Sequence, residues 1–442
     1  MVNQRTFPYQ HFDQTKKPLG SPWLGEHLTN SKPRVAVLHY TALPIIGGVE
    51  NVIADHARLF ARAGYPFTLI TGRGGDDKQL NGANVVVIPE IDSEHPDNLK
   101  IARALDEGQV LPEFAMLQAR IEKQLAPVFA ETDVLIAHNV LNYHFNLPLT
   151  VALHDMIDQH LAPHTIDWCH DISRYVNPSS GFAPRFGFPW DGLRICRTEI
   201  TYVAVSPRRQ RMLADTLHCS PDLIRVIPNG VAADVFWSLS EIGQRVLTEC
   251  DLLNADLILL MPIRVTRAKN IEFGLRVAAA LQATGVEPRL IVTGPPDPHV
   301  PDTTEYFQEL LALRHELGLD DRMFFLHEKN LSLDMAHVAE LYRLCDLILM
   351  PSHREGFGLP VLEGALLGKP VFATNVPIVE QLDADSVYLI DADESAEQVA
   401  ARMRDWMERT PEHRLKLLAR KRFSWASIFA HGIEPLIKGL VA

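Results

Sequence analysis

The stretch Pro351-Ser-His-Arg-Glu-Gly-Phe-Gly-Leu-Pro-Val-Leu-Glu363 decides how the second half of the chain folds. It follows Asp346-Leu-Ile-Leu-Met350, a nearly unbroken apolar run that is typical of a strand buried on both faces of a parallel sheet. Gly368-Lys-Pro370 comes after it and predicts a helix end. The order is therefore strand, Gly-bearing turn and short helix, with Pro360 in the first turn of that helix.

The same stretch carries chemistry. Gly356 and Gly358 let backbone N–H groups approach a ligand, and a helix N-terminus favours negative charge there. Glu355 and Glu363 repel phosphate but can accept hydrogen bonds from sugar hydroxyls. Amides suited to phosphate beside carboxylates suited to hydroxyls indicate a nucleotide-sugar. The alternative is an ordinary strand–turn–helix with two solvated glutamates.

Length and composition limit the classes of protein. The 442 residues allow two or three domains, and 47% are apolar, enough for sizeable cores. A net charge of −13 argues against a general affinity for nucleic acid or anionic lipid. The five cysteines contain no C-x-x-C pair, which argues against a zinc site or a disulfide framework. No apolar run resembles a membrane span or signal core, so we expect a soluble, cytoplasmic protein.

The string EGFGLPVLEGALLGKPV places seven residues between Glu355 and Glu363. It resembles the E-x7-E segment of retaining GT-B glycosyltransferases, in particular the large GT4 family. The resemblance implies an α/β fold with two Rossmann-like domains that face each other across a central cleft. It also implies a last helix that crosses back to the first domain. The implied parts are an N-terminal extension (1–32), an acceptor domain (33–228 with 423–442) and a nucleotide-sugar donor domain (229–422).

The first domain opens with a predicted strand, 34–39, and an amphipathic helix that begins near residue 49. Gly47 and Gly48 lie between them, at the expected ligand-binding edge of an open α/β sheet. The pattern is not G-x-G-x-x-G. It is similar to the GG-V-E loop of GT4 enzymes, which implies that both glycines leave room for the donor diphosphate. A bare tight turn is the alternative.

Two further residues of the first domain are candidates. His170 follows the predicted strand 165–169, and the resemblance gives to it, and not to His138, a role beside the transferred sugar. Ser206 is a predicted N-cap. Arg208 follows in the first turn, where a cation opposes the helix dipole and needs an anionic partner, so it is a candidate donor contact. A structural histidine and a solvated basic face are the alternatives.

Two segments lack periodicity. Residues 1–32 predict an irregular extension, packed on the surface by aromatic side chains or serving as an interaction arm. Residues 173–194 are rich in aromatics, proline and glycine, as in long functional loops. We expect this loop to help form the acceptor pocket, although a structural cover over the sheet edge is an equal alternative.

The second domain begins with the predicted strand 256–261. Arg264 and Lys269 lie five residues apart on the following loop, where two cations can stabilise a diphosphate leaving group. They match the R…K-N pattern of GT4 enzymes together with Asn270; a surface basic loop is the alternative. Gly294 and His327 lie at the ends of the next two predicted strands. By family position, the exit at His327 lies near the nucleobase.

The predicted function is transfer of a hexosyl group from a nucleotide diphosphate sugar, UDP-glucose or GDP-mannose, to an acceptor hydroxyl with retention. No metal or cofactor is expected, because Arg264 and Lys269 neutralise the diphosphate and Asp-x-Asp is absent. The alternatives are an epimerase or phosphorylase on this fold, a non-catalytic binding subunit, and a membrane-surface transferase with a lipid acceptor. The predicted catalytic residues are His170, Arg264, Lys269 and Glu355. The predicted donor-binding residues are Gly47, Gly48, Arg208, Asn270, Gly294, His327, Gly356, Phe357, Gly358, Leu359 and Glu363.

Overall fold

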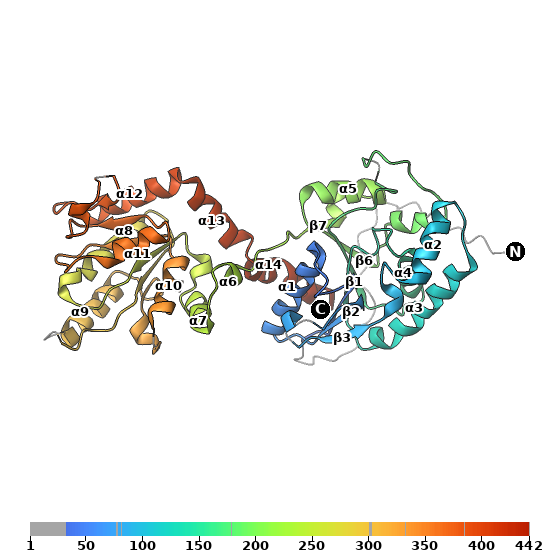
Figure 1. Ribbon diagram of the computed structural model, residues 1–442, viewed down its shortest axis with the longest axis horizontal. Coiled ribbons are helices and arrows are strands. Elements are labelled where there is room, and N and C mark those ends of the chain that lie inside the picture. Colours follow the sequence, from blue (N-terminus) through green and yellow to red (C-terminus); the bar gives the residue numbers. More distant parts are fainter. Residues whose placement is uncertain are drawn as a thin grey trace. The chain divides into compact units, whose positions relative to one another are not determined.

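The computed structural model describes residues 32–441 except 77, 81, 178, 300–302, 332 and 384. The expectations for residues 1–31 lie outside the described residues. The chain forms two compact units. The first takes in the chain up to Gly230 and the segment from Trp425, and the second is Val231–Ser424. Each is built on its own parallel sheet with alternating helices (Figure 1), so the predicted α/β two-domain fold is confirmed. How the two domains face each other stays a prediction.

The first unit contains a seven-stranded sheet in the order β3-β2-β1-β4-β5-β6-β7, with every neighbouring pair parallel. Its strands are β1 (Val35–Thr41), β2 (Phe67–Arg73), β3 (Asn84–Val87), β4 (Val134–His138), β5 (His164–Cys169), β6 (Ile200–Ala204) and β7 (Ile224–Val226). Its helices are α1 (Gly48–Arg62), α2 (Pro96–Asp106), α3 (Pro112–Ala130), α4 (Leu147–Asp158), α5 (Pro207–Leu217), α14 (Trp425–Ile428) and α15 (Glu434–Val441), the last two joined by a π-helical turn.

The C-terminal segment of the chain packs on α1 of the first unit. The Trp425 ring lies 5.3 Å from the His56 ring, and the Phe429 ring lies 5.4 Å from the Phe60 ring. Gly230 allows this packing, because a Cβ there would lie 2.6 Å from the Trp425 ring. The buried aromatic contacts hold the last helices to a domain that begins almost 400 residues earlier.

The second unit contains a six-stranded sheet in the order β10-β9-β8-β11-β12-β13, again parallel throughout. Its strands are β8 (Leu257–Met261), β9 (Pro288–Val292), β10 (Met323–Phe325), β11 (Leu347–Met350), β12 (Val371–Ala373) and β13 (Tyr388–Leu389). Its helices are α6 (Ala233–Phe236), α7 (Glu241–Glu249), α8 (Ile271–Ala283), α9 (Thr303–Glu316), α10 (Met335–Leu344), α11 (Leu359–Leu366), α12 (Ala396–Arg409) and α13 (Pro411–Arg422).

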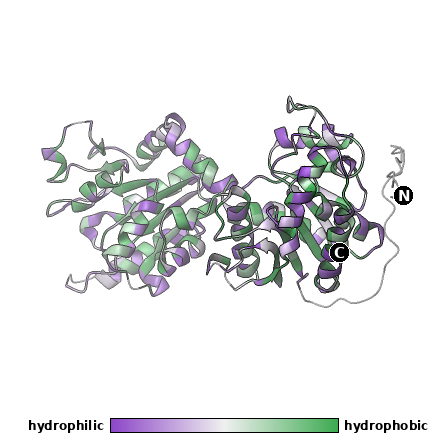
Figure 2. Cartoon of the chain, turned by 45° about the vertical axis from the view of Figure 1, so that its right-hand side comes forward, coloured by the Kyte–Doolittle hydropathy of each residue, from purple (hydrophilic) through white to green (hydrophobic). Residues whose placement is uncertain are grey.

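Both faces of the second sheet are covered. Alternate residues of β8 point to opposite sides: Leu257 and Leu259 pack with residues of α8, α9 and α12, whereas Ile258 packs with residues of α7, α10 and α11. All four residues of β11 are buried. This two-sided burial explains the unbroken apolar strands, which appear as hydrophobic ribbons inside each unit (Figure 2).

In each sheet there is a switch point, where the strands that follow along the chain are added on the opposite side of the first strand. In the first unit it lies between β1 and β4, and in the second between β8 and β11. Ligands of open α/β sheets bind outside the carboxyl ends of the strands at such a point. The loops after β1, β4, β8 and β11 are therefore the first places to look for a site.

Helix α13 was not predicted, because its buried face is polar. Arg420 and His413 are its buried residues. The Arg420 guanidinium donates to both carboxylate oxygens of Asp346 at 3.1 and 2.9 Å, and Lys416 Nζ lies 2.7 Å from the same carboxylate. Burial opposes ionisation of Asp346, but these two cations hold its pKa below the usual range. A helix is predicted from apolar residues that recur at helical spacing, and α13 lacks that pattern.

Candidate active site

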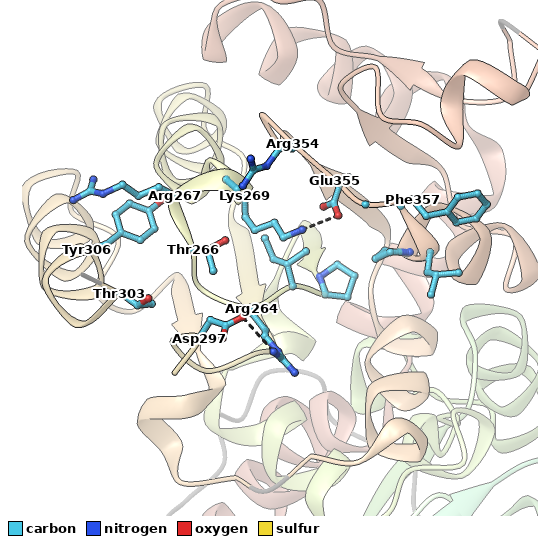
Figure 3. Close-up of a pocket in the computed structure, with 17 residues that line it drawn as sticks. Arg264, Thr266, Arg267, Lys269, Asp297, Thr303, Tyr306, Arg354, Glu355 and Phe357 are labelled. Atoms are coloured by element: carbon cyan, nitrogen blue, oxygen red, sulfur yellow. Dashed lines mark hydrogen bonds and ion pairs between the residues drawn. The ribbon is translucent and has the colours of Figure 1, made fainter. Parts of the chain in front are cut away.

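A pocket of about 900 Å³ opens at the carboxyl edge of the second sheet. The loop after β8, the segment after β9, the start of α9 and the turn between β11 and α11 form its walls (Figure 3). The pocket therefore lies at the switch point of this sheet. It is lined by Pro262, Ile263, Arg264, Thr266, Arg267, Ala268, Lys269, Asp297, Thr303, Tyr306, Arg354, Glu355, Gly356, Phe357, Gly358, Leu359 and Pro360.

Lys269 and Glu355 meet inside this pocket. Lys269 Nζ lies 2.7 Å from Glu355 Oε2, and their side chains are 20% and 9% exposed. The Ser352 hydroxyl donates to the other oxygen of Glu355 at 2.9 Å. The backbone N–H of His353 donates to the Ala268 carbonyl at 2.9 Å and ties the two loops together. The predicted cation and the predicted carboxylate are thus brought together by neighbouring strands.

Arg264 lines the same pocket but is held differently. Its guanidinium lies 3.2 Å from the Asp297 carboxylate, and its side chain is 61% exposed. A hydrogen bond from the His299 N–H and the Arg264 guanidinium lower the pKa of Asp297. Gly294 packs closely against the backbone of the loop that carries Arg264. A Cβ at Gly294 would lie 2.7 Å from the Ile263 carbonyl and 2.8 Å from Arg264 Cα. Gly294 supports the loop that carries Arg264 and is outside the described lining.

A third wall comes from residues that sequence reasoning missed. The Arg267 guanidinium lies 4.6 Å from the centre of the Tyr306 ring and forms two hydrogen bonds to Glu309, at 2.8 and 2.6 Å. Arg354 is exposed and forms no ion pair with any residue that the structure describes. Arg354 directly precedes Glu355 and Arg267 lies two residues before Lys269, and this closeness in sequence is the signal that could have found them. Tyr306 lies on a separate helix and has no such signal.

The turn before α11 presents backbone to the pocket. Gly358 has φ +100°, a left-handed conformation that favours glycine, and Gly356 has open space where a Cβ would lie. Phe357 and Leu359 are exposed. The lining carries four cationic and two anionic side chains, and α11 begins at its edge. This combination suits an anionic ligand with additional polar groups.

In the second unit, Asn270, His327 and Glu363 lie outside the described lining, as Gly294 does. Glu363 accepts a hydrogen bond from the Tyr342 hydroxyl at 2.5 Å, and burial together with this bond raises the pKa of Tyr342. Asn270 has φ +51° and precedes α8. His327 is exposed, with its ring 6.1 Å from that of Phe307. Their roles stay predictions.

In the first unit, Gly47 is the N-cap of α1 and Gly48 is its first residue, and the Glu50 carboxylate lies beside Gly47. The Thr41 hydroxyl donates to Glu50 Oε1 at 2.6 Å. A Cβ on Gly47 would collide with the Glu50 carboxylate, whereas one on Gly48 would meet open space. A side chain at Gly47 would displace the Glu50 carboxylate from its place beside Thr41. The role of both glycines at the donor diphosphate stays a prediction.

His170 lies at the carboxyl end of β5, as predicted. Its Nε2 lies 2.8 Å from His138 Nδ1, and burial lowers the pKa of His170 to about 3. The next residue, Asp171, forms an ion pair with Arg209 at 2.9 Å. The anionic partner expected for the first turn of α5 thus belongs to Arg209. Arg208 is exposed and has no ion pair among the described residues.

The segment 173–194 is ordered by aromatic and cationic contacts. The Arg185 guanidinium lies 4.1 Å from the centre of the Tyr175 ring and 4.7 Å from that of the Trp190 ring. Trp190 is buried in the core of the first unit. This packing is compatible with a segment that covers the edge of the sheet. A role of residues 173–194 in acceptor binding stays a prediction.

Across the described ranges, no three His, Cys, Asp or Glu side chains are grouped so as to hold a metal ion. No helix in the described part of the chain is both long and apolar enough to cross a bilayer.

The fold and the pocket define an α/β protein of two parallel-sheet units with a cation-rich pocket at the switch point of the second sheet. Two family models match this chain: Glycosyl transferases group 1 over residues 252–422, and Glycosyltransferase Family 4 over residues 46–235. The chain belongs to the group 1 glycosyltransferases of the GT4 type, which confirms the resemblance.

Several curated relatives carry the name D-inositol 3-phosphate glycosyltransferase. The protein from Stackebrandtia nassauensis is 32% identical over 170 residues, 37% of this chain and 36% of the relative. The protein from Mycolicibacterium smegmatis is 30% identical over 220 residues, 48% of this chain and 46% of the relative. The chain therefore matches less than half the length of these relatives.

Solved structures also match over most of the chain. A glycosyltransferase from Rickettsia africae is 18% identical with a TM-score of 0.35, over 93% of this chain and 99% of that one. The sucrose-phosphate synthase from Thermosynechococcus elongatus is 16% identical with a TM-score of 0.39, over 93% and 99%.

Proposed function

We propose that this protein transfers a hexosyl group from a nucleoside diphosphate sugar to an acceptor hydroxyl, with retention at the anomeric carbon. Membership of the GT4-type family supports the reaction class. The observation that carries the proposal is the Lys269–Glu355 pair at 2.7 Å within the cation-rich pocket.

The donor diphosphate is the ligand that the cations suit best. Lys269 is held by Glu355 and Arg264 by Asp297, so both positive charges are in place before a ligand enters. As the bond from the anomeric carbon to the phosphate oxygen breaks, negative charge grows on the diphosphate. Preorganised cations stabilise that charge more than they stabilise the ground state. Arg264, Lys269 and the start of α11 supply the countercharge, so we propose transfer without a metal ion.

The carboxylates serve the carbohydrate parts of the donor. Glu355 has one oxygen on Lys269 and one on the Ser352 hydroxyl. Carboxylate oxygens accept more than one hydrogen bond, so Glu355 can also take sugar hydroxyls. Glu363 is assigned to the ribose hydroxyls, with Tyr342 fixing its carboxylate. His170 is assigned to the transferred sugar. The acceptor proton passes to the departing diphosphate on the same face of the sugar, which gives retention without a covalent enzyme intermediate.

The donor and acceptor can be found by two assays. UDP-, GDP- and ADP-sugars are compared by thermal shift, because a ligand that binds only the native state raises the melting temperature. UDP-glucose and GDP-mannose are the expected donors. D-inositol 3-phosphate is the first acceptor to try, because the relatives' names contain it.

The product then decides the reaction. Transfer should require an acceptor, release the nucleoside diphosphate, and proceed with EDTA present. Conversion of the donor alone would indicate an epimerase instead. A protein that binds none of these donors would refute the proposal.

A further inference from the structure

His170 is held at two points by the consecutive residues His138 and Asn139. Its ring contacts His138, with Nε2 and His138 Nδ1 2.8 Å apart. Its backbone N–H donates to Asn139 Oδ1 at 2.7 Å, and the N–H of Asp171 donates to the same oxygen at 3.1 Å. Because β4 and β5 are parallel neighbours, His138 and His170 emerge from the same edge of the sheet.

Asn139 is itself fixed by the strands around it. It has φ +52°, a conformation that asparagine tolerates better than most residues. Its N–H donates to the Trp168 carbonyl at 3.1 Å, and its carbonyl accepts from the Tyr40 hydroxyl at 3.1 Å. The side-chain oxygen is therefore aimed at the turn that carries His170.

The two contacts of the His170 ring nitrogens favour one of its two neutral tautomers. The other nitrogen, Nδ1, faces the side-chain nitrogen Nδ2 of Asn229 at 3.5 Å, and this NH₂ group can only donate. Nδ1 accepts this long contact only when it is unprotonated, and a neutral His170 then carries its proton on Nε2 and donates it to His138 Nδ1. His138 in turn carries its proton on Nε2, which is buried and has no hydrogen-bond partner among the described residues.

The surroundings keep both rings neutral near pH 7. Burial lowers the pKa of His170 to about 3 and that of His138 well below its usual value, and a positive charge on either ring would oppose the other. The His56 ring lies 5.2 Å from that of His138, and His39 Nδ1 contacts the His138 carbonyl at 2.8 Å. Burial lowers the pKa of His56 to about 3 and also lowers that of His39.

We propose that His138 and Asn139 are positioning residues that hold His170 with its Nδ1 lone pair toward the substrate. His170 then accepts a hydrogen bond from a sugar hydroxyl and does not donate one. The hydroxyl would replace the long contact from Asn229. The role in transfer rests on the proposed function, whereas the proton position can be tested without any activity.

The direct test is nuclear magnetic resonance of the full-length protein labelled with ¹⁵N-histidine, at about pH 7. Long-range ¹H–¹⁵N correlations distinguish the two neutral tautomers, and the His170 signals are those missing from His170→Ala. We expect Nε2 protonated and Nδ1 unprotonated. Protonated Nδ1 in the wild type would overturn the proposal, whether or not the variants at His138 and Asn139 fold.

Variants test the two contacts separately. His138→Phe removes the acceptor and should convert the His170 signals to a mixture or to the other tautomer, whereas His138→Gln keeps an acceptor oxygen and should preserve them. A wild-type pattern in His138→Phe would refute the role of His138. His164→Gln, on the exposed first residue of β5, is the matched control.

Kinetics measure the consequence for transfer. Asn139→Ala and His138→Phe should lower kcat by roughly 100-fold, because a displaced catalytic group costs about that much. The donor KM should change much less, and Asn139→Asp, which keeps the oxygen, should restore most of kcat. A normal kcat in Asn139→Ala would refute the role of Asn139. If the wild type transfers no sugar, the proposed function fails while the tautomer result still stands.

Discussion

Removing the Lys269 ammonium tests the site most sharply by mutation. In Lys269→Ala the diphosphate loses one of its two assigned cations. Loss of one preorganised charge-stabilising group costs about 2–4 kcal/mol of transition-state stabilisation. That range corresponds to a roughly 30- to 1,000-fold fall in kcat. The Glu355 side chain, only 9% exposed, keeps the Ser352 hydroxyl but loses its cation. We expect this loss to cost about 1–3 kcal/mol of stability.

The assay is initial-rate transfer with saturating donor, alongside denaturant unfolding. Lys100→Ala is the matched control, because Lys100 pairs with Glu113 at the same 2.7 Å but both side chains are far more exposed. The control should leave the transfer rate and the free energy of unfolding unchanged. Since Lys269 and Glu355 contact each other, the effects of Lys269→Ala and Glu355→Ala should not add in the double variant. Near-normal rates in both single variants would refute the site assignment.

Three further changes have definite expected results. Tyr342→Phe removes the hydrogen bond to Glu363 and should weaken donor binding by about 1.5–3 kcal/mol, measured calorimetrically, with kcat little changed; unchanged affinity would argue against a role for Glu363 in the donor site. Asp167 is buried, which raises its pKa from 3.8 to about 8, so its contribution to stability is complete below pH 3.8 and is lost as pH rises toward 8. Asp167→Asn should therefore match the wild type near pH 4 and be more stable by roughly 5 kcal/mol near pH 8, and a constant difference in unfolding free energy would contradict this. Trp425→Ala should destabilise the first unit by about 3–5 kcal/mol in denaturant unfolding, and a loss below about 1 kcal/mol would show that the C-terminal packing matters little.

The strands could be predicted because a strand that is buried on both faces has apolar residues at nearly every position. The meeting of Lys269 and Glu355 was foreseeable for a related reason. Each follows a strand of one parallel sheet, and β8 and β11 are neighbours, so their loops leave from the same edge. The turn before α11 could be predicted because Gly358 has a left-handed backbone conformation that other residues rarely adopt. Such a position selects glycine, and a glycine is visible in the sequence.

The rest depended on contacts between segments far apart in sequence. Tyr306 reaches the pocket from α9, and Tyr342 reaches Glu363 from α10, and no periodicity identifies either partner. Helix α13 turns a polar face to a buried carboxylate. The strand-edge argument applied equally to His138 and His170, but the resemblance selected one of them. The structure instead shows that the two rings form one hydrogen-bonded pair.

A crystal structure of the full-length protein with its nucleoside diphosphate sugar would test the central claim most directly. The account predicts the diphosphate within hydrogen-bonding distance of Lys269 and Arg264 and the hexose against Glu355. A diphosphate bound elsewhere, with the Lys269–Glu355 pair undisturbed and facing solvent, would contradict it.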